Sequence, residues 1–168
     1  MDTEQNPMYQ QNALPPRVRQ FIFRFIKYSL VILILGWTAQ SLWFHSLPRT
    51  QLKIGSHTLH VVVADSPRSR AQGLMFRLVL NEEEGMLFVN DRPRKVCMWM
   101  KYTFIPLSVA FLREDGAIAS VDDMEPMTLR RHCALERVRY ALEVPQGWFA
   151  TNAVTERSAV TGLPHQAQ

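Results

Sequence analysis

The chain has 168 residues, of which 47% are hydrophobic and 20% are charged, which suits one globular domain with an additional segment. Lys and Arg total 19 against 15 Asp and Glu, but four of the basic residues lie before Leu47, so the remainder is close to electrical balance. Such a balance argues against a nucleic-acid partner. The sequence contains no P-loop, paired CxxC, HExxH or dinucleotide-binding glycine pattern, so no cofactor or metal is expected.

The N-terminal part divides into two segments. Residues 1–20 are polar and lack periodicity, which predicts a disordered cytoplasmic tail. Residues 21–44 are apolar except for Arg24 and Lys27, whose long side chains can reach the lipid headgroups. The uncharged run from Tyr28 to Phe44 has 17 residues, near the lower limit for crossing a bilayer core of about 30 Å. We therefore expect a transmembrane signal anchor over 21–44.

Two other interpretations of this segment stay open. The first is a signal peptide, which could be cleaved near Ala39-Gln40-Ser41, although bulky residues follow that site. The second is a soluble core helix, which is disfavoured because such a helix would keep a polar face and this segment is apolar all round. The basic residues that precede the apolar run favour an N-terminus in the cytoplasm. We expect a single-pass protein of the bacterial inner membrane, with residues 45–51 as a linker and a domain over 52–168 that is periplasmic or extracellular. The basic residues in question are Arg17, Arg19, Arg24 and Lys27.

Short β-type segments separated by turns dominate the predicted domain. Residues 50–54 and 58–65 form a hairpin pattern around Gly55-Ser56, and Ser66 followed by Pro67 is typical of a helix start, with Gly73 near its end. Further strands are expected over 85–89, 95–101, 106–113, 117–124 and 138–144, followed by a short helix or turn and a last strand. The predicted fold is mostly β (α+β): a small antiparallel barrel or rolled sheet, built as a meander, with one or two short helices.

The strand expected over 95–101 has an unusual composition. Period-two alternation puts Met98 and Met100 on one face, which we expect to be core, and Trp99 with Lys101 on the opposite face, next to a cleft. Trp99, in the middle of the sheet, is expected to be a core residue. For Trp148, core and surface groove are equally open.

Four separated runs carry a family resemblance: "SRAQGLMFR", "EGMLFV", "PRKVCMWMKYTFIPLSVAFLREDGAIASVDDMEP" and "YALEVPQGWFA". Their order and content resemble the DUF192 family of bacterial and archaeal proteins, from Leu52 to about Val160. The resemblance implies a compact, mostly β domain, often behind a signal or anchor, and assigns no activity. The chain departs from the family pattern at Tyr102 (usually Asn), at Ser108 (usually Asp) and at Arg157-Ser158 (often Gly-Asp).

The charged members of these motifs are the candidate ligand-binding residues. Around a cleft, the basic side chains could hold an anionic ligand, while Glu84 or Glu143 balances them or acts as a base. The alternative is an ion-pair network between the helix and the sheet. A Lys is rarely buried alone, so Lys101 should meet Glu84 or Glu143, or project into a pocket. The candidates, with the adjacent tryptophan, are Arg70, Arg77, Glu84, Trp99, Lys101 and Glu143.

Sulfur-containing residues offer further alternatives. The methionines of the domain could bind Cu(I) outside the cytoplasm, but they are scattered singly, as in an apolar core. Cys97 and Cys133 form one disulfide or remain separate thiols, and a catalytic Cys133–His132 pair is disfavoured because sequence neighbours seldom have the required geometry. These methionines are Met75, Met86, Met98, Met100, Met124 and Met127.

Three functions follow from these patterns. The first is a membrane-tethered extracytoplasmic binding or accessory domain for an envelope ligand or protein, with a cleft lined by charged and aromatic side chains. The second is an envelope-polymer hydrolase or transferase that uses Glu84 or Glu143. The third is Met/Cys metal handling. The first is favoured because neither a nucleophile nor a metal triad is visible.

Overall fold

The computed structural model describes residues 15–164, which fall into two compact units, one ending at Ser46 and one beginning at Leu47. The first unit contains a single helix, α1 (Pro16–His45), with a proline in its first turn. By length and composition, its 30 residues suffice to cross a membrane. The predicted disordered tail over 1–20 is wrong from Pro16 onward, because those residues belong to α1, and residues 1–14 lie outside the described part.

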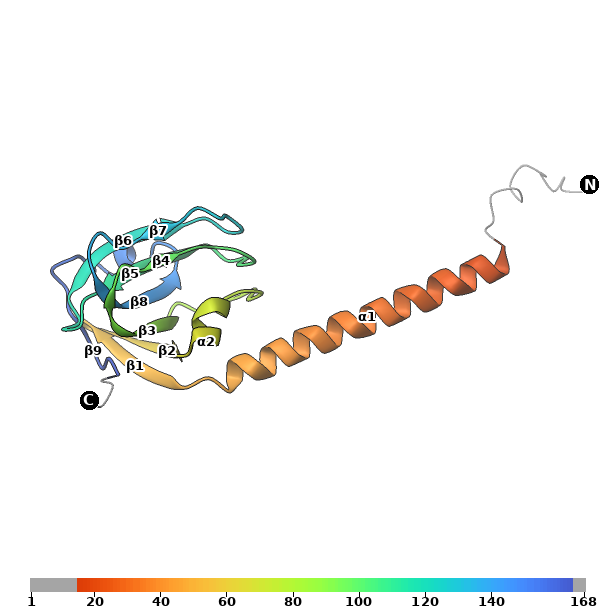
Figure 1. The fold of residues 1–168 in the computed structure, drawn as a ribbon, viewed down its shortest axis with the longest axis horizontal. Coiled ribbons are helices and arrows are strands. Elements are labelled where there is room, and N and C mark those ends of the chain that lie inside the picture. The colour runs from red at the N-terminus through yellow and green to blue at the C-terminus, as the bar shows by residue number, and fades with distance from the viewer. Residues whose placement is uncertain (1–14, 165–168) are drawn as a thin grey trace, which may run out of the picture. The chain divides into compact units, whose positions relative to one another are not determined.

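The second unit is built on a curled sheet of seven strands in the order β6-β5-β8-β3-β2-β1-β9, with a separate two-stranded sheet of β4 and β7 (Figure 1). The mostly β fold class predicted from the sequence is confirmed. The strands are β1 (Arg49–Ile54), β2 (His57–Ala64), β3 (Glu84–Arg94), β4 (Cys97–Met98), β5 (Leu107–Leu112), β6 (Ile118–Met124), β7 (His132–Cys133), β8 (Val138–Pro145) and β9 (Val160–Thr161), and the helices are α2 (Pro67–Gln72) and α3 (Trp148–Thr151).

The chain order within the sheet differs from a meander. β2 and β3 are parallel, because the connection through α2 brings the chain back to the same end of the sheet, and β8 inserts between β3 and β5. The last strand, β9, pairs with the first, β1, through Thr161 opposite Lys53 and Val160 opposite Ile54. β1 begins at Arg49, inside the segment that the sequence predicts as a linker.

Both faces of the central strands are buried. Leu87, Leu142 and Ala110 point into the main hydrophobic core. Trp148 belongs to the same core, so of the two alternatives left open for this tryptophan, the core position is the correct one. The opposite face carries Met86 and Phe88 of β3 and is also almost inaccessible to water. A strand buried on both faces has no site where a polar side chain can be solvated.

The helix α2 starts and ends as its sequence predicts. Ser69 N–H donates to Ser66 Oγ, and Ser66 N–H donates to Ser69 Oγ, which satisfies two free N–H groups at the start of the helix. Gly73 ends the helix at a φ of 51°, with the Phe88 ring close to where a Cβ would lie. Arg70 donates to the carbonyl oxygens of Asp65 and Val89, at 2.5 and 2.8 Å, and so ties α2 to β3.

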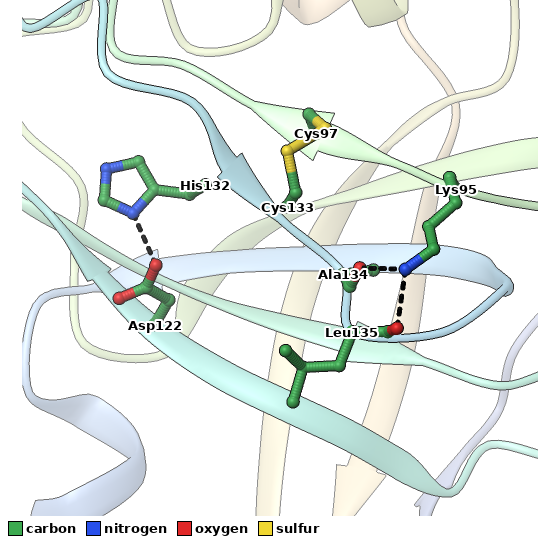
Figure 2. Close-up of a disulfide and its surroundings, with 7 residues drawn as sticks. All are labelled: Lys95, Cys97, Asp122, His132, Cys133, Ala134 and Leu135. Atoms are coloured by element: carbon green, nitrogen blue, oxygen red, sulfur yellow. Dashed lines mark hydrogen bonds and ion pairs between the residues drawn. A yellow bond between two sulfur atoms is a disulfide. The ribbon is translucent and has the colours of Figure 1, made fainter.

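A disulfide joins the two strands of the small sheet. Cys97 and Cys133 are register partners with a Cα–Cα distance of 4.0 Å, and their S–S bond resolves the alternatives that the sequence left open (Figure 2). Beside it, Lys95 Nζ donates to the carbonyl oxygens of Ala134 and Leu135. Two residues per strand give few backbone hydrogen bonds, so this cross-link, typically worth about 2–4 kcal/mol, is a major part of what holds the small sheet together.

The strand predicted over 95–101 is much shorter than expected. Regular pairing stops at Met98, and Met100 N–H donates to the carbonyl of Thr128 before the chain turns at Tyr102, where φ is 55°. The predicted alternation is nevertheless confirmed on one face, because Met98 and Met100 are both buried.

We predict that Met100→Ala lowers the free energy of unfolding by about 2–5 kcal/mol, because it leaves a cavity in a fully buried position. The matched control is Met127→Ala, which removes the same side chain from an exposed position and should change stability by less than about 0.5 kcal/mol. Urea unfolding of the two purified variants measures the difference. Equal stabilities would contradict the core assignment of Met100.

Candidate functional site

Four motif segments that are distant in the sequence meet around one small cavity. Its volume is about 20 Å³, enough for roughly one water molecule. The turn after α2 contributes Gly73, β3 contributes Phe88, the segment after β4 contributes Trp99 and Thr103, and β8 contributes Glu143. The remaining lining residues are Arg70, Ala71, Gln72, Leu74, Met75 and Met98. Each of the four motif runs that carry the family resemblance therefore supplies at least one wall residue.

Glu143 is the buried functional group of this cavity. It lies on β8 between Met86 of β3 and Val109 of β5, and only 4% of it is exposed. Among residues 15–164, no side chain or backbone group pairs with its carboxyl. Burial raises its pKa from 4.5 to about 8. At neutral pH, Glu143 is therefore an uncharged carboxylic acid that can donate a hydrogen bond or a proton into the cavity.

Trp99 forms part of the cavity wall and reaches the surface. The expectation that it is a core residue is wrong, because 48% of it is exposed. The reason is that β4 ends at Met98, so Trp99 follows the chain out of the sheet. The Lys101 ammonium lies over the Trp99 ring, 5.6 Å from its centre, and over the Tyr102 ring at 5.0 Å. Both contacts are typical cation–π distances.

The predicted ion pair of Lys101 with Glu84 or Glu143 does not form. None of the ion pairs among residues 15–164 includes Lys101, whose ammonium lies over the two aromatic rings. Glu84 instead lies 4.0 Å from the guanidinium of Arg77, with both side chains partly exposed. Solvated pairs of this kind contribute little to stability.

The six predicted residues thus separate into two groups. Arg70, Trp99 and Glu143 line the cavity, and Lys101 covers Trp99. Arg77 and Glu84 form a surface pair that is not part of the cavity wall.

Sequence reasoning missed an exposed aromatic surface beside this cavity. It is formed by three segments, 74–80, 99–104 and 125–131, which we call the loop platform. The Phe76 ring stacks on Tyr102 with their centres 5.5 Å apart, and it lies 6.3 Å from the Phe104 ring. The run "LMFRLVL" carried a signal, because it is apolar in a stretch with neither strand nor helix periodicity.

Backbone hydrogen bonds connect the three segments of the loop platform. Phe76 N–H donates to Tyr102 O at 2.8 Å, and Met127 N–H donates to Thr103 O at 3.0 Å. Phe76, Tyr102 and Met127 all have positive φ angles, between 55° and 63°. This left-handed conformation costs a non-glycine residue roughly 1 kcal/mol, so it indicates that the surrounding contacts hold these turns in place.

Sulfur and metal chemistry find little support among residues 15–164. Met86, Met100 and Met124 are fully buried core residues, and both cysteines are in the disulfide. The described residues contain no group of three or more His, Cys, Asp or Glu side chains that could hold a metal ion. His132 is buried and its Nδ1 lies 2.6 Å from an Asp122 oxygen, so it serves the β6–β7 contact (Figure 2).

A larger surface pocket lies where β2 begins and β8 ends. Its volume is about 410 Å³, and its polar wall includes His57, His60, Glu82 and Glu83 beside Trp148. It contains none of the six predicted residues, and its acidic side chains are exposed. We therefore place the candidate site at the Glu143 cavity, which combines a buried acid with the motif segments.

Comparisons with known proteins identify the family of this chain. Residues 50–162 match DUF192, described as an uncharacterized ACR. The chain belongs to the DUF192 family. No curated protein matches it.

Two solved structures share the fold. A protein from Sinorhizobium meliloti 1021, provisionally named as a transcription regulator, is 32% identical with a TM-score of 0.68, over 70% of this chain and 95% of that one. A protein of unknown function from Novosphingobium aromaticivorans DSM 12444 is 26% identical with a TM-score of 0.63, over 68% and 84% of the two chains. These matches establish the family and the fold, and the activity has to be argued from the site.

The raised pKa of Glu143 predicts how its substitution changes the pH dependence of stability. Folded protein keeps the proton up to about pH 8, whereas the unfolded chain releases it near pH 4.5. Stability should therefore fall as pH rises between these values, by at most about 1.4 kcal/mol per pH unit. Glu143→Gln cannot ionise, so its stability relative to the parent should increase from pH 5 to pH 8.

Urea unfolding at several pH values measures this difference. Glu83→Gln, at an exposed position, is the control and should keep the parent's pH dependence. A Glu143→Gln variant that follows the parent in parallel across the window would show that Glu143 is ionised in the folded protein.

Proposed function

We infer that this DUF192 protein is a membrane-tethered binding or accessory domain that works outside the cytoplasm. The apolar helix α1, with Arg17, Arg19, Arg24 and Lys27 before its uncharged run, supports a single-pass anchor with the N-terminus inside. The Cys97–Cys133 disulfide supports an oxidising compartment such as the periplasm or cell exterior.

The binding site is the cavity of Glu143 with Trp99 and Lys101 at its mouth. The observation that carries this proposal is the unpaired, buried acid at the place where the four motif segments meet. A buried carboxyl without a partner costs stability, so its presence is best explained by a ligand group that completes its hydrogen bonds. Trp99 offers a ring face for stacking and Lys101 a positive charge for an anionic part of the ligand.

An envelope-polymer hydrolase or transferase is the second candidate. A neutral Glu143 at pH 7 has the protonation state that a general acid needs. Glu84 is a weaker candidate, because it is partly exposed and lies beside Arg77. A binding role is favoured because the cavity accommodates about one water molecule, too little room for a polymer segment.

The first test concerns location. Alkaline phosphatase fused after Gln168 should be active in cells, because the domain is exported and the reporter needs an oxidising compartment. The same fusion without residues 1–46 is the control and should be inactive. An inactive full-length fusion, with normal amounts of protein, would contradict the proposed topology.

The second test concerns binding. The photo-crosslinker benzoylphenylalanine, placed at Trp99 of the full chain in living cells, should form an adduct with an envelope component. The same crosslinker at Leu135, which is exposed outside the site, should not. Adding Lys101→Ala should weaken the Trp99 adduct, because the cation at the mouth is lost. An equal pattern at both positions would contradict a site at Trp99.

A further inference from the structure

We propose that the loop platform docks on the surface of the bilayer that holds α1, with its apolar side chains among the lipid headgroups. The proposal rests on the membrane tether of the proposed function and names the membrane as a second partner of the domain. It assigns a role to a surface that adjoins the Glu143 site and shares Trp99 and Lys101 with it, but whose other exposed side chains do not line the cavity.

The loop platform carries a cluster of exposed apolar side chains. Aromatic and aliphatic side chains of all three segments are at least 45% exposed: Phe76, Leu78, Tyr102, Phe104, Met127 and Leu129. Single exposed apolar residues are common, but a cluster from three segments marks an interaction surface. A mixture of Tyr, Phe and Trp is characteristic of protein surfaces at the lipid–water interface.

Basic side chains accompany these apolar ones. The three segments contain Arg77, Lys101, Arg130 and Arg131 but a single acidic residue, Glu125. Arg130 and Arg131 are exposed, and Lys101 extends over two aromatic rings. Lipid phosphates attract such residues, with about 1 kcal/mol for each Lys or Arg near an anionic surface, and their apolar stems can remain in contact with the rings.

The turns of the loop platform are built to present their side chains outward. The left-handed residues Phe76, Tyr102 and Met127 lie at three turns that backbone hydrogen bonds connect. These hydrogen bonds hold the apolar surface in place, so it does not need to be ordered on contact with lipid.

The chain enters the domain at the same end. Val63 N–H donates to the carbonyl of Pro48, and Val63 lies at the end of β2 that leads into α2 and on to segment 74–80. Figure 1 shows the three loops side by side at the end of the sheet where α2 lies and where β1 begins. The surface and the point of entry therefore belong to one end of the domain.

The connection to α1 is short. Residues 46–48 separate His45, the last residue of α1, from Arg49, the first of β1. Four extended steps span at most about 14 Å, so this end of the domain cannot move far from the bilayer. A soluble protein partner would have to bind within that narrow space, which favours the membrane itself as the occupant.

Fluorescence in lipid nanodiscs tests the proposal on the full chain. The dye NBD is attached to a cysteine introduced by Leu78→Cys or Leu129→Cys, with the native disulfide intact. The matched control is Leu135→Cys, an exposed leucine at the opposite end of the β4–β7 pair. A label at Ile32→Cys, within α1, reports the anchor. The nanodiscs contain phosphatidylethanolamine and phosphatidylglycerol, with or without nitroxide-labelled acyl chains.

We expect blue-shifted emission and nitroxide quenching at positions 78, 129 and 32, and neither at position 135. The Arg130→Gln/Arg131→Gln double variant should lose part of the quenching at 129. Quenching at 32 without quenching at 78 and 129 would overturn the docking proposal, leave the tether intact, and point to a protein partner for the loop platform. Absence of quenching at 32 would overturn the tether, and with it the docking.

Discussion

Burial of both faces of the central strands β3 and β8 is the constraint on which the rest of the domain depends. One face packs into the main core, and the other is covered by α2 and the segment after β4. Glu143 sits in this second layer, where the register with β3 and β5 leaves only 4% of it exposed. Its neutral state, its cavity and the convergence of the four motif segments all follow from that one position in the sheet.

Local features of the sequence predicted the elements well. Ser66 and Pro67 indicated the start of α2, and alternation identified Met98 and Met100 as core residues, because both signals depend on near neighbours in the chain. The parallel pairing of β2 with β3 could not be predicted in this way. It depends on how a 19-residue connection crosses the sheet, and the sequence of either strand is equally compatible with an antiparallel partner.

The sequence indicated which residues belong to the site better than it indicated which groups those residues contact. Trp99 and Glu143 were identified, but whether a charge meets a carboxylate, a carbonyl or a ring depends on contacts between segments far apart in the chain. Arg70 bonds to two backbone carbonyls, and Lys101 lies over aromatic rings, partly because Tyr102 supplies a second ring where the family usually has Asn. The buried acid and the left-handed turns of this region both lower stability, and destabilising features of this kind are common at functional sites.

The pairing of β9 with β1 also sets the order in which the domain can form. Lys53 meets Thr161 across 108 residues, and Gly162 lets the last strand approach closely, since a Cβ there would lie 2.4 Å from the carbonyl oxygen of Gln51. During synthesis, β1 therefore keeps one edge unpaired until β9 has been made. Such high contact order slows folding, and an open edge is prone to wrong pairing. Full stability of the domain is thus reached only after translation of its final residues.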